Sequence, residues 1–328
     1  MLNFERKSHH LIHEHELVEI LERWYPTEMA CKEVLRIQVL SWLKNSGIIN
    51  GEENLKVFEK TGIHCFAARL FPLAEPSDLD VISKLFALLF IMDDMADQLN
   101  DGDFWKTVQT TPSKIAGNIS DQRLDFMDSI LDLIFTSKWG MGDCLRLLYT
   151  VIRFVGKGEE EQQIRKKRQT PSLKKYWSIK TESSGFQIAW TLLHILFPQN
   201  KINAQLLSRL NRLIAKIIIL ENDIMSFHKE SLIGDVFNMV HLRMERFGES
   251  KICATNFVKN FIEDLKGQFA QICLQHLPTL PLECFSSDAF EKGLLIKHQE
   301  WHSLASMWCL VKGSHIWATM DTNRYNQK

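Results

Sequence analysis

Two groups of oxygen-bearing side chains, far apart in the chain, have the spacing of cation ligands. The first is Asp93, Asp94 and Asp97, which directly follow an apolar run. Residues three and four apart share one face of a helix, so Phe86 and Phe90 lead into these carboxylates along a stripe. Carboxylates crowded at the end of an apolar face repel one another unless a proton or a cation relieves them. Taken alone, this group fits both a magnesium site and an acidic helix end exposed to solvent.

The second group is Asn222, Ser226 and Glu230, spaced four residues apart. Over two helical turns this spacing puts an amide oxygen, a hydroxyl and a carboxylate on one face. Three oxygen donors that carry one negative charge could hold one Mg²⁺ and leave positive charge over for an anion. The spacing therefore predicts a second metal site.

The composition predicts an all-α protein. Its 328 residues include only 15 Gly and 8 Pro, which favours long helices over an architecture with many turns. Hydrophobic residues make up 45% and charged residues 24%, so a chain of this length can bury a substantial core. Lys and Arg number 39 against 40 Asp and Glu, and this balance produces no global field that would favour nucleic acid.

The cysteines and the chain start predict a soluble, cytoplasmic protein without a membrane anchor. The seven cysteines are odd in number, widely spread and without close pairs, which favours reduced thiols. Histidines near the N-terminus have no fixed ligand spacing, so we expect a solvated arm over about residues 1–20 and not a metal site or a signal peptide. The longest apolar runs are too short to span a membrane.

Apolar residues at helical spacing predict helices along nearly the whole chain, and we expect a single domain over residues 1–328. The helix over residues 79–99 is apolar almost to its end, so it is expected at the centre of the fold, capped by Ser77 or Asp78. The remaining predicted helices cover residues 28–44, 124–135, 143–155, 206–227, 235–243, 254–269 and 294–311, with a short helix from residue 66.

Three local features refine this prediction. In the helix over 28–44 the predicted buried stripe includes Val34, Leu35 and Ile37. The tract over 159–168 is acidic first and basic after, which favours a helix with pairs from i to i+4. A further helix restarts near Ser172, and a break or close backbone approach is expected at Gly185, because glycine inside a helix costs about 1 kcal/mol relative to alanine.

The two ligand groups each end a long apolar helix, so they could face each other across the cavity of a helical bundle. The product would be an apolar pocket with a magnesium-lined mouth. Such a pocket suits a substrate with a hydrocarbon tail and a diphosphate head, because the tail prefers apolar walls and the head needs cations.

These residues resemble the class I terpene synthases of the microbial type. The segment 93–97 is similar to the family's aspartate-rich motif, and the segment 222–230 is similar to its second metal motif. Arg324-Tyr325, preceded by Gly313 and Trp317, is similar to the pair that closes the site at the C-terminus. The resemblance covers nearly the whole chain, since Phe71-Pro72 and Asn238-Met239-Val240 also match.

The resemblance implies a single α-helical terpenoid synthase domain that uses three Mg²⁺ ions, with Mn²⁺ as a substitute. It implies that diphosphate is pulled from an allylic isoprenoid and that the carbocation becomes a terpene hydrocarbon or alcohol. Farnesyl diphosphate is the expected substrate, ahead of the geranylgeranyl and geranyl diphosphates. A monomer or a homodimer is expected.

By the same resemblance Asp93 is the main metal ligand, and Asp94 and Asp97 support it as ligands or by orienting it. The second motif, Asn222, Ser226 and Glu230, would bind the third ion.

Lys229, Arg324 and Tyr325 would contact the diphosphate by the resemblance. The family usually has an arginine as diphosphate sensor, and its best match here is Lys180, which can supply charge but no bidentate fork. Ser184-Gly185 resembles the helix break beside that sensor.

Aromatic side chains could shape the pocket, because their faces stabilise a cation that has no solvent, although core packing explains each of them as well. The candidates are Phe86, Phe90, Trp190, Trp308 and Trp317.

Two alternative functions stay open from the sequence. A chain-elongating prenyl diphosphate synthase uses similar chemistry, but it would carry a second aspartate-rich motif where this chain has Asn222, Ser226 and Glu230. A non-catalytic helical binding protein would not need intact metal ligands at both motifs.

Overall fold

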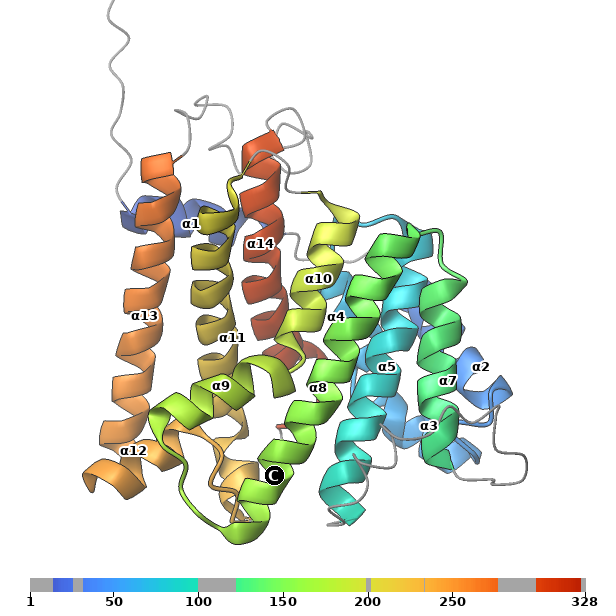
Figure 1. Ribbon diagram of the computed structural model, residues 1–328, viewed down its shortest axis with the longest axis horizontal. Helices are drawn as coiled ribbons and strands as arrows, with labels where there is room; N and C mark the ends of the chain where they lie inside the picture. Colours follow the sequence, from blue (N-terminus) through green and yellow to red (C-terminus); the bar gives the residue numbers. More distant parts are fainter. Residues whose placement is uncertain are drawn as a thin grey trace, which may run out of the picture.

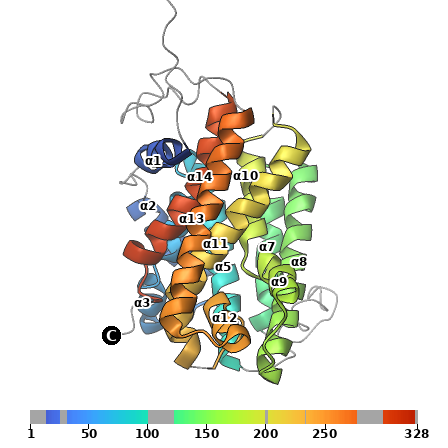
Figure 2. The ribbon, with the colours of Figure 1, turned by 90° about the vertical axis from the view of Figure 1, so that its left-hand side faces the viewer.

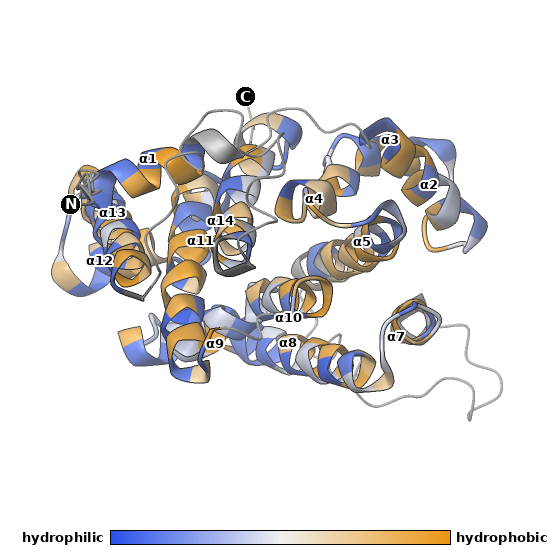
Figure 3. Ribbon diagram, turned by 90° about the horizontal axis from the view of Figure 1, so that it is seen from above, coloured by the Kyte–Doolittle hydropathy of each residue, from blue (hydrophilic) through white to orange (hydrophobic). Residues whose placement is uncertain are grey.

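The computed structural model describes residues 14–25, 32–99, 122–198, 202–232, 234–276 and 299–325. Within these ranges the secondary structure is helical and contains no strand, so the all-α prediction is confirmed. The long helices stand side by side, and α9 lies across them (Figure 1). Seen along their axes, the helices surround the middle of the molecule (Figure 3).

Seven helices frame the middle of the bundle. α4 packs against α5 and α14, α11 packs against α14 and α9, and α8 packs against α9 and α10. Their bounds are α4 Ile63–Leu70, α5 Pro76–Leu99, α8 Met141–Lys167, α9 Leu173–Ser183, α10 Phe186–Leu196, α11 Ala204–Leu232 and α14 Gln299–Ile316.

The remaining helices lie outside this frame, and η3 follows α14 and packs against α4. α13 packs along α11, with α1 and α12 against it (Figure 2). Their bounds are α1 Glu14–Trp24, α2 Lys32–Asn45, α3 Glu52–Glu59, α7 Gln122–Phe135, α12 Met239–Phe247, α13 Lys251–His276 and the π-helical turn η3 Trp317–Asp321.

Buried apolar side chains from α1 to η3 form one contiguous cluster. The described helices therefore share a core, whereas one domain over the whole of residues 1–328 stays a prediction. No helix in the described ranges has both the length and the apolar character needed to cross a membrane.

α5 starts at Pro76, three residues before the predicted start. Proline suits the first turn, because the N–H group it lacks would have no partner there. Asp78 does not cap the helix but lies inside its first turn, where its Oδ1 accepts a hydrogen bond from Trp139 Nε1 at 2.9 Å. This contact ties the start of α5 to the segment before α8.

α8 is one continuous helix through the charged tract. Lys157 Nζ lies 2.6 Å from Glu160 Oε2, and Arg165 Nη2 lies 2.5 Å from Glu161 Oε1. These pairs confirm that the tract is helical and that its charges are paired at helical spacing.

The predicted break separates α9 from α10. Ser172 caps α9, its hydroxyl accepting a hydrogen bond from Lys175 N at 3.2 Å. Gly185 has φ +74°, a left-handed conformation that glycine adopts without a steric penalty, and α10 begins at the next residue. The break at Ser184-Gly185 is therefore confirmed.

Two predictions near the N-terminus are wrong. The arm predicted over residues 1–20 is wrong for residues 14–20, because α1 begins at Glu14 and buries Leu17 completely, and residues 1–13 lie outside the described residues. In α2 the buried stripe contains Leu35, as predicted, but Val34 and Ile37 are exposed. A wide apolar face was predicted for this helix, but α2 buries only the narrow stripe Leu35, Val39 and Leu43, spaced four residues apart.

Two further differences concern short helices. α12 begins at Met239 and not at residue 235, because Asn238 is its cap and accepts a hydrogen bond from Val240 N at 2.8 Å. The sequence did not predict α3, whose apolar residues are few and whose buried side chains are Leu55 and Phe58.

Candidate active site

The first ligand group lies at the C-terminal end of α5. Asp93 lines the central cavity. Both carboxylate oxygens of Asp94 accept hydrogen bonds from Arg324, from Nη1 and Nη2 at 2.7 Å each. Asp97 belongs to α5, but its side chain lies outside the described residues.

The second ligand group lies in α11, where Asn222, Ser226 and Glu230 all line the same cavity. Asn222 Nδ2 donates a hydrogen bond to Tyr325 Oη at 2.7 Å. Arg324 contacts Asp94 of the first group, and the next residue, Tyr325, contacts Asn222 of the second. The Cα atoms of these two consecutive residues are about 3.8 Å apart. The groups therefore lie close together at the mouth of one cavity.

The second group has the features of an oxygen-donor site for a divalent cation. Ser226 Oγ is buried and has no hydrogen-bond partner among the described residues, although an unpaired buried hydroxyl is destabilising. Glu230 Oε2 accepts a hydrogen bond from Asn238 Nδ2 at 2.7 Å. Amide, hydroxyl and carboxylate oxygens fit a hard cation such as Mg²⁺, and Ser226 would gain a partner.

Acidic groups are crowded and buried beside these ligands. Burial raises the pKa of Asp223 to about 7, with Lys180 opposing and Glu230 adding to the effect. Burial likewise raises the pKa of the Glu230 carboxyl, although Lys180 opposes it. A bound divalent cation would stabilise the ionised carboxylate of Glu230.

Lys180 is buried inside this acidic cluster and also lines the cavity. Its Nζ lies 3.6 Å from Glu161 Oε1 and 3.9 Å from Asp223 Oδ1, and it donates to Phe237 O at 3.4 Å. Burial disfavours the charged amine, but Glu161 and Asp223 outweigh it and hold the pKa of Lys180 well above its usual value. Lys180 is therefore a cation at neutral pH.

A group of charged residues in the cavity wall was not predicted from the sequence. Arg165 and Glu161 line the cavity from α8, and Asp235 lines it from the segment before α12. Arg165 Nη2 donates to Glu161 Oε1 at 2.5 Å, and its Nε lies 3.1 Å from Asp235 Oδ2. The i to i+4 spacing indicated the pair, but it does not reveal which face of a charged helix turns inward.

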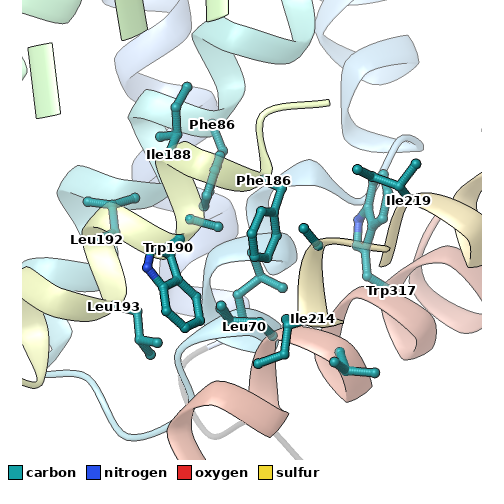
Figure 4. Packing of buried hydrophobic residues seen from close by; sticks show 14 of the residues in the cluster. Leu70, Phe86, Phe186, Ile188, Trp190, Leu192, Leu193, Ile214, Ile219 and Trp317 are labelled. Carbon is teal, nitrogen blue, oxygen red and sulfur yellow. The ribbon is translucent and has the colours of Figure 1, made fainter. Parts of the chain in front are cut away.

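An aromatic wall lies behind the polar mouth. Phe66 from α4 makes edge contacts with Phe86 at 5.1 Å and Phe90 at 5.4 Å between ring centroids. Trp317 lies 5.3 Å from Phe90, and the Arg324 guanidinium lies 5.0 Å from the Phe90 centroid. Figure 4 shows how side chains from different helices pack around this region. The sequence analysis did not single out Phe66.

The cavity has a volume of about 220 Å³. Six other residues named from the sequence also line it: Lys180, Ser184, Gly185, Lys229, Arg324 and Tyr325. Trp308 lies elsewhere, 1% exposed in the core, where it stacks on Phe269 at 5.2 Å. Trp190 does not line the cavity; its ring centroid lies 6.0 Å from that of Phe186, which does (Figure 4).

Solved structures share this fold. The linalool/nerolidol synthase from Streptomyces clavuligerus, in complex with 2-fluorogeranyl diphosphate, has a TM-score of 0.69 at 13% identity, over 88% of this chain and 98% of that one. An α-eudesmol synthase has a TM-score of 0.64 at 17% identity, over 89% and 97% of the two chains. The fold is thus that of the class I terpene synthases.

The sequence comparisons give the family. The family model described as "Terpene synthase family 2, C-terminal metal binding" matches residues 84–266, more than half of the chain. A pentalenene synthase from Streptomyces arenae is 25% identical over 290 residues, 85% of this chain and 84% of its own. A sesquiterpene synthase from Cyclocybe aegerita is 23% identical over 274 residues, 76% and 71% of the two chains. The chain belongs to terpene synthase family 2 and is a terpene synthase, a lyase.

Proposed function

We propose that this enzyme ionises an allylic isoprenoid diphosphate, with farnesyl diphosphate as its main substrate, in a magnesium-dependent reaction. The bond between the allylic carbon and the diphosphate oxygen breaks, and its electron pair leaves with the diphosphate. The carbocation that results ends as a terpene hydrocarbon by loss of a proton, or as an alcohol by capture of water.

One observation carries this proposal: two oxygen-rich helix faces are connected by consecutive residues above an aromatic cavity. Arg324 pairs with Asp94 of the first motif, and Tyr325 accepts from Asn222 of the second. The polar mouth suits a diphosphate and the apolar wall suits a hydrocarbon chain. The same molecule can therefore occupy both.

Asp93, Asp94 and Asp97 on one side, and Asn222, Ser226 and Glu230 on the other, would hold three Mg²⁺ ions, and Mn²⁺ could substitute. The metal-binding description of the family supports the use of divalent metal. When bound, the ions supply Lewis-acid stabilisation of the negative charge on the departing diphosphate.

Basic and phenolic donors at the mouth would bind the diphosphate. Lys229, Arg324 and Tyr325 line the cavity beside the metal motifs, and charge-assisted hydrogen bonds to phosphate oxygens are among the strongest in proteins. Lys180 would act in the same place as a buried cation. Its nearest anionic partner, Glu161, also pairs with Arg165, so both cations lie in one network.

The aromatic wall would stabilise the carbocation after ionisation. The faces of Phe86, Phe90 and Trp317 attract a cation electrostatically, and this attraction is largest where water is excluded. These side chains also limit how the hydrocarbon chain can fold, so they would influence which product forms.

A farnesyl chain is supported by the relatives. One is a sesquiterpene synthase by name, and another is a pentalenene synthase. The structural neighbour with a geranyl analogue is a linalool/nerolidol synthase, so geranyl diphosphate is the second candidate substrate. A cytoplasmic location and a monomeric or homodimeric state stay predictions.

Incubation with geranyl, farnesyl and geranylgeranyl diphosphates and Mg²⁺, followed by gas chromatography of the extract, tests the proposal. We expect a terpene from farnesyl diphosphate and none from the Asp93→Ala variant. Absence of any product at all three chain lengths would refute the proposed reaction. A longer prenyl diphosphate formed on addition of isopentenyl diphosphate would indicate a chain-elongating enzyme instead.

A further inference from the structure

A buried ion pair joins α4 to the end of η3. Arg69 Nε donates to Asp321 Oδ2 at 2.6 Å, and Arg69 Nη2 donates to Asp321 Oδ1 at 3.2 Å. The side chains of Arg69 and Asp321 are 7% and 4% exposed, so the pair is nearly free of solvent screening. Lys32 of α2 adds a second cation, 3.1 Å from Asp321 Oδ1.

Asp321 is the last residue of η3, and the chain turns there toward the site. Thr322 N donates to Trp317 O at 3.1 Å, and Arg324 N donates to Thr322 Oγ1 at 3.1 Å. Only two residues separate Asp321 from Arg324, so holding Asp321 in place limits the positions that the Arg324 guanidinium can reach.

Two glycines allow close backbone contacts at α4, Gly62 with the C-terminal segment and Gly313 of α14 with Arg69. A Cβ on Gly62 would lie 2.1 Å from Asp321 O, and a Cβ on Gly313 would lie 2.0 Å from Arg69 O. Trp317 Nε1 donates to Gly62 O at 2.9 Å, and Asn323 N donates to Lys60 O at 3.4 Å. The segment from Trp317 to Asn323 is therefore held against the start of α4 on both sides of Asp321.

Beyond this anchor the chain makes the two contacts that join the metal motifs. Arg324 binds both oxygens of Asp94, and Tyr325 accepts from Asn222. If the preceding turn were free, placing Arg324 and Tyr325 over the cavity would cost backbone entropy as well as the rotamer entropy of each side chain. Holding the turn in place removes the backbone part of this cost.

We propose that Arg69 and Asp321 are positioning residues for the reaction, which hold the C-terminal segment so that Arg324 and Tyr325 meet the diphosphate at the mouth of the cavity. The inference rests on the proposed function for its catalytic consequence. It does not require either residue to touch the substrate.

The test compares Asp321→Asn, which removes the charge at similar size, with Glu22→Gln as a control. Glu22 of α1 pairs with Lys312 of α14, so this variant removes a different ion pair, one that does not involve Asp321 or the residues after it. We expect Asp321→Asn to raise KM for the allylic diphosphate about tenfold or more with a smaller change in kcat. The share of uncyclised prenyl alcohol should also rise, because the open mouth admits water. Glu22→Gln should match the wild type in both.

A double-variant cycle separates positioning from general stability. If Asp321 acts through Arg324 and Tyr325, then Asp321→Asn should weaken Mg²⁺-dependent binding of inorganic diphosphate by a larger factor in the wild-type background than in Arg324→Gln. Equal fold-changes in the two backgrounds would overturn the proposal, as would a lower melting temperature with unchanged binding. If Asp321→Asn does not fold, Lys32→Gln should give a smaller shift in the same direction.

A third measurement does not depend on the reaction. Hydrogen exchange of the peptide covering residues 317–325 should speed up in Asp321→Asn and stay unchanged in Glu22→Gln. Unchanged exchange in Asp321→Asn would overturn the proposal. If the wild type forms no terpene while exchange and diphosphate binding behave as expected, then the proposed reaction is wrong and the positioning role stands.

Discussion

The hydroxyl of Ser226 does not help the protein to fold, but the proposed chemistry needs it as a metal ligand. Its buried hydroxyl has no hydrogen-bond partner in the described part of the chain, so the fold gains little from it. We expect Ser226→Ala to leave the melting temperature within a few degrees of the wild type. The Mg²⁺ concentration that gives half-maximal activity should rise about tenfold or more, because one oxygen ligand is lost.

Ser83 provides a matched control for this prediction. Its hydroxyl is also buried without a partner in the described residues, but it lies in α5 and does not line the cavity. Ser83→Ala should resemble Ser226→Ala in its thermal melt and the wild type in its magnesium titration. A magnesium requirement unchanged in Ser226→Ala would remove this residue from the ligand set.

At the scale of elements, a comparison of Gly47 with Gly62 distinguishes the cost of a left-handed backbone from the cost of a steric clash. Gly47 and Gly62 both have a left-handed φ, +72° and +65°, but only Gly62 lies against another segment. Gly47→Ala should lower the free energy of unfolding by about 1–2 kcal/mol, the penalty of a left-handed alanine. Gly62→Ala should lose roughly 1–3 kcal/mol more, because its Cβ would meet the backbone of Asp321. Denaturant titrations measure both, and equal losses would contradict the close contact.

His194, in α10, makes the free energy of unfolding of the protein depend on pH. Burial lowers the pKa of His194 to about 4, with Arg146 adding to the effect. Between about pH 6.5 and 4 the unfolded chain therefore binds a proton that the folded protein does not, and the free energy of unfolding falls as pH decreases through this window. His194→Gln should flatten this part of the stability profile. A profile as steep as that of the wild type would show that other groups produce it.

At the scale of the whole molecule, metal and diphosphate should act together as a stabilising ligand. The two oxygen-donor motifs come from α5 and α11, and the C-terminal segment connects them, so a ligand bound by all three holds distant parts of the bundle together. At about 100 times the dissociation constant, a ligand adds about 2.7 kcal/mol to the free energy of unfolding. We therefore expect Mg²⁺ with inorganic diphosphate to raise the melting temperature by a few degrees.

Chelation of the metal should reverse that shift and abolish turnover. Asp93→Ala should melt at the same temperature with and without the two ligands. A full shift in Asp93→Ala would show that the metal and diphosphate bind elsewhere.

The sequence by itself determined most of the helices, though not α1 or α3, and the two oxygen-donor motifs, because both depend on spacing within one helix. Periodicity identified α5 and α11, and the four-residue spacing placed Asn222, Ser226 and Glu230 on one face. A glycine in the left-handed region explains why the break at Gly185 was predictable. These are local properties, set by residues a few positions apart.

Only the tertiary structure decided which faces meet. Arg324 and Asp94 are 230 residues apart, and nothing in the spacing of either indicates the other. An apolar stripe on one helix can pack against the apolar stripe of any other helix. Periodicity therefore does not show that Phe66 lines the cavity while Trp308 lies in the core. Charge spacing likewise could not show that Arg165 turns inward. Long-range packing determines which side chains face the cavity, because it determines which neighbouring helix covers a given face.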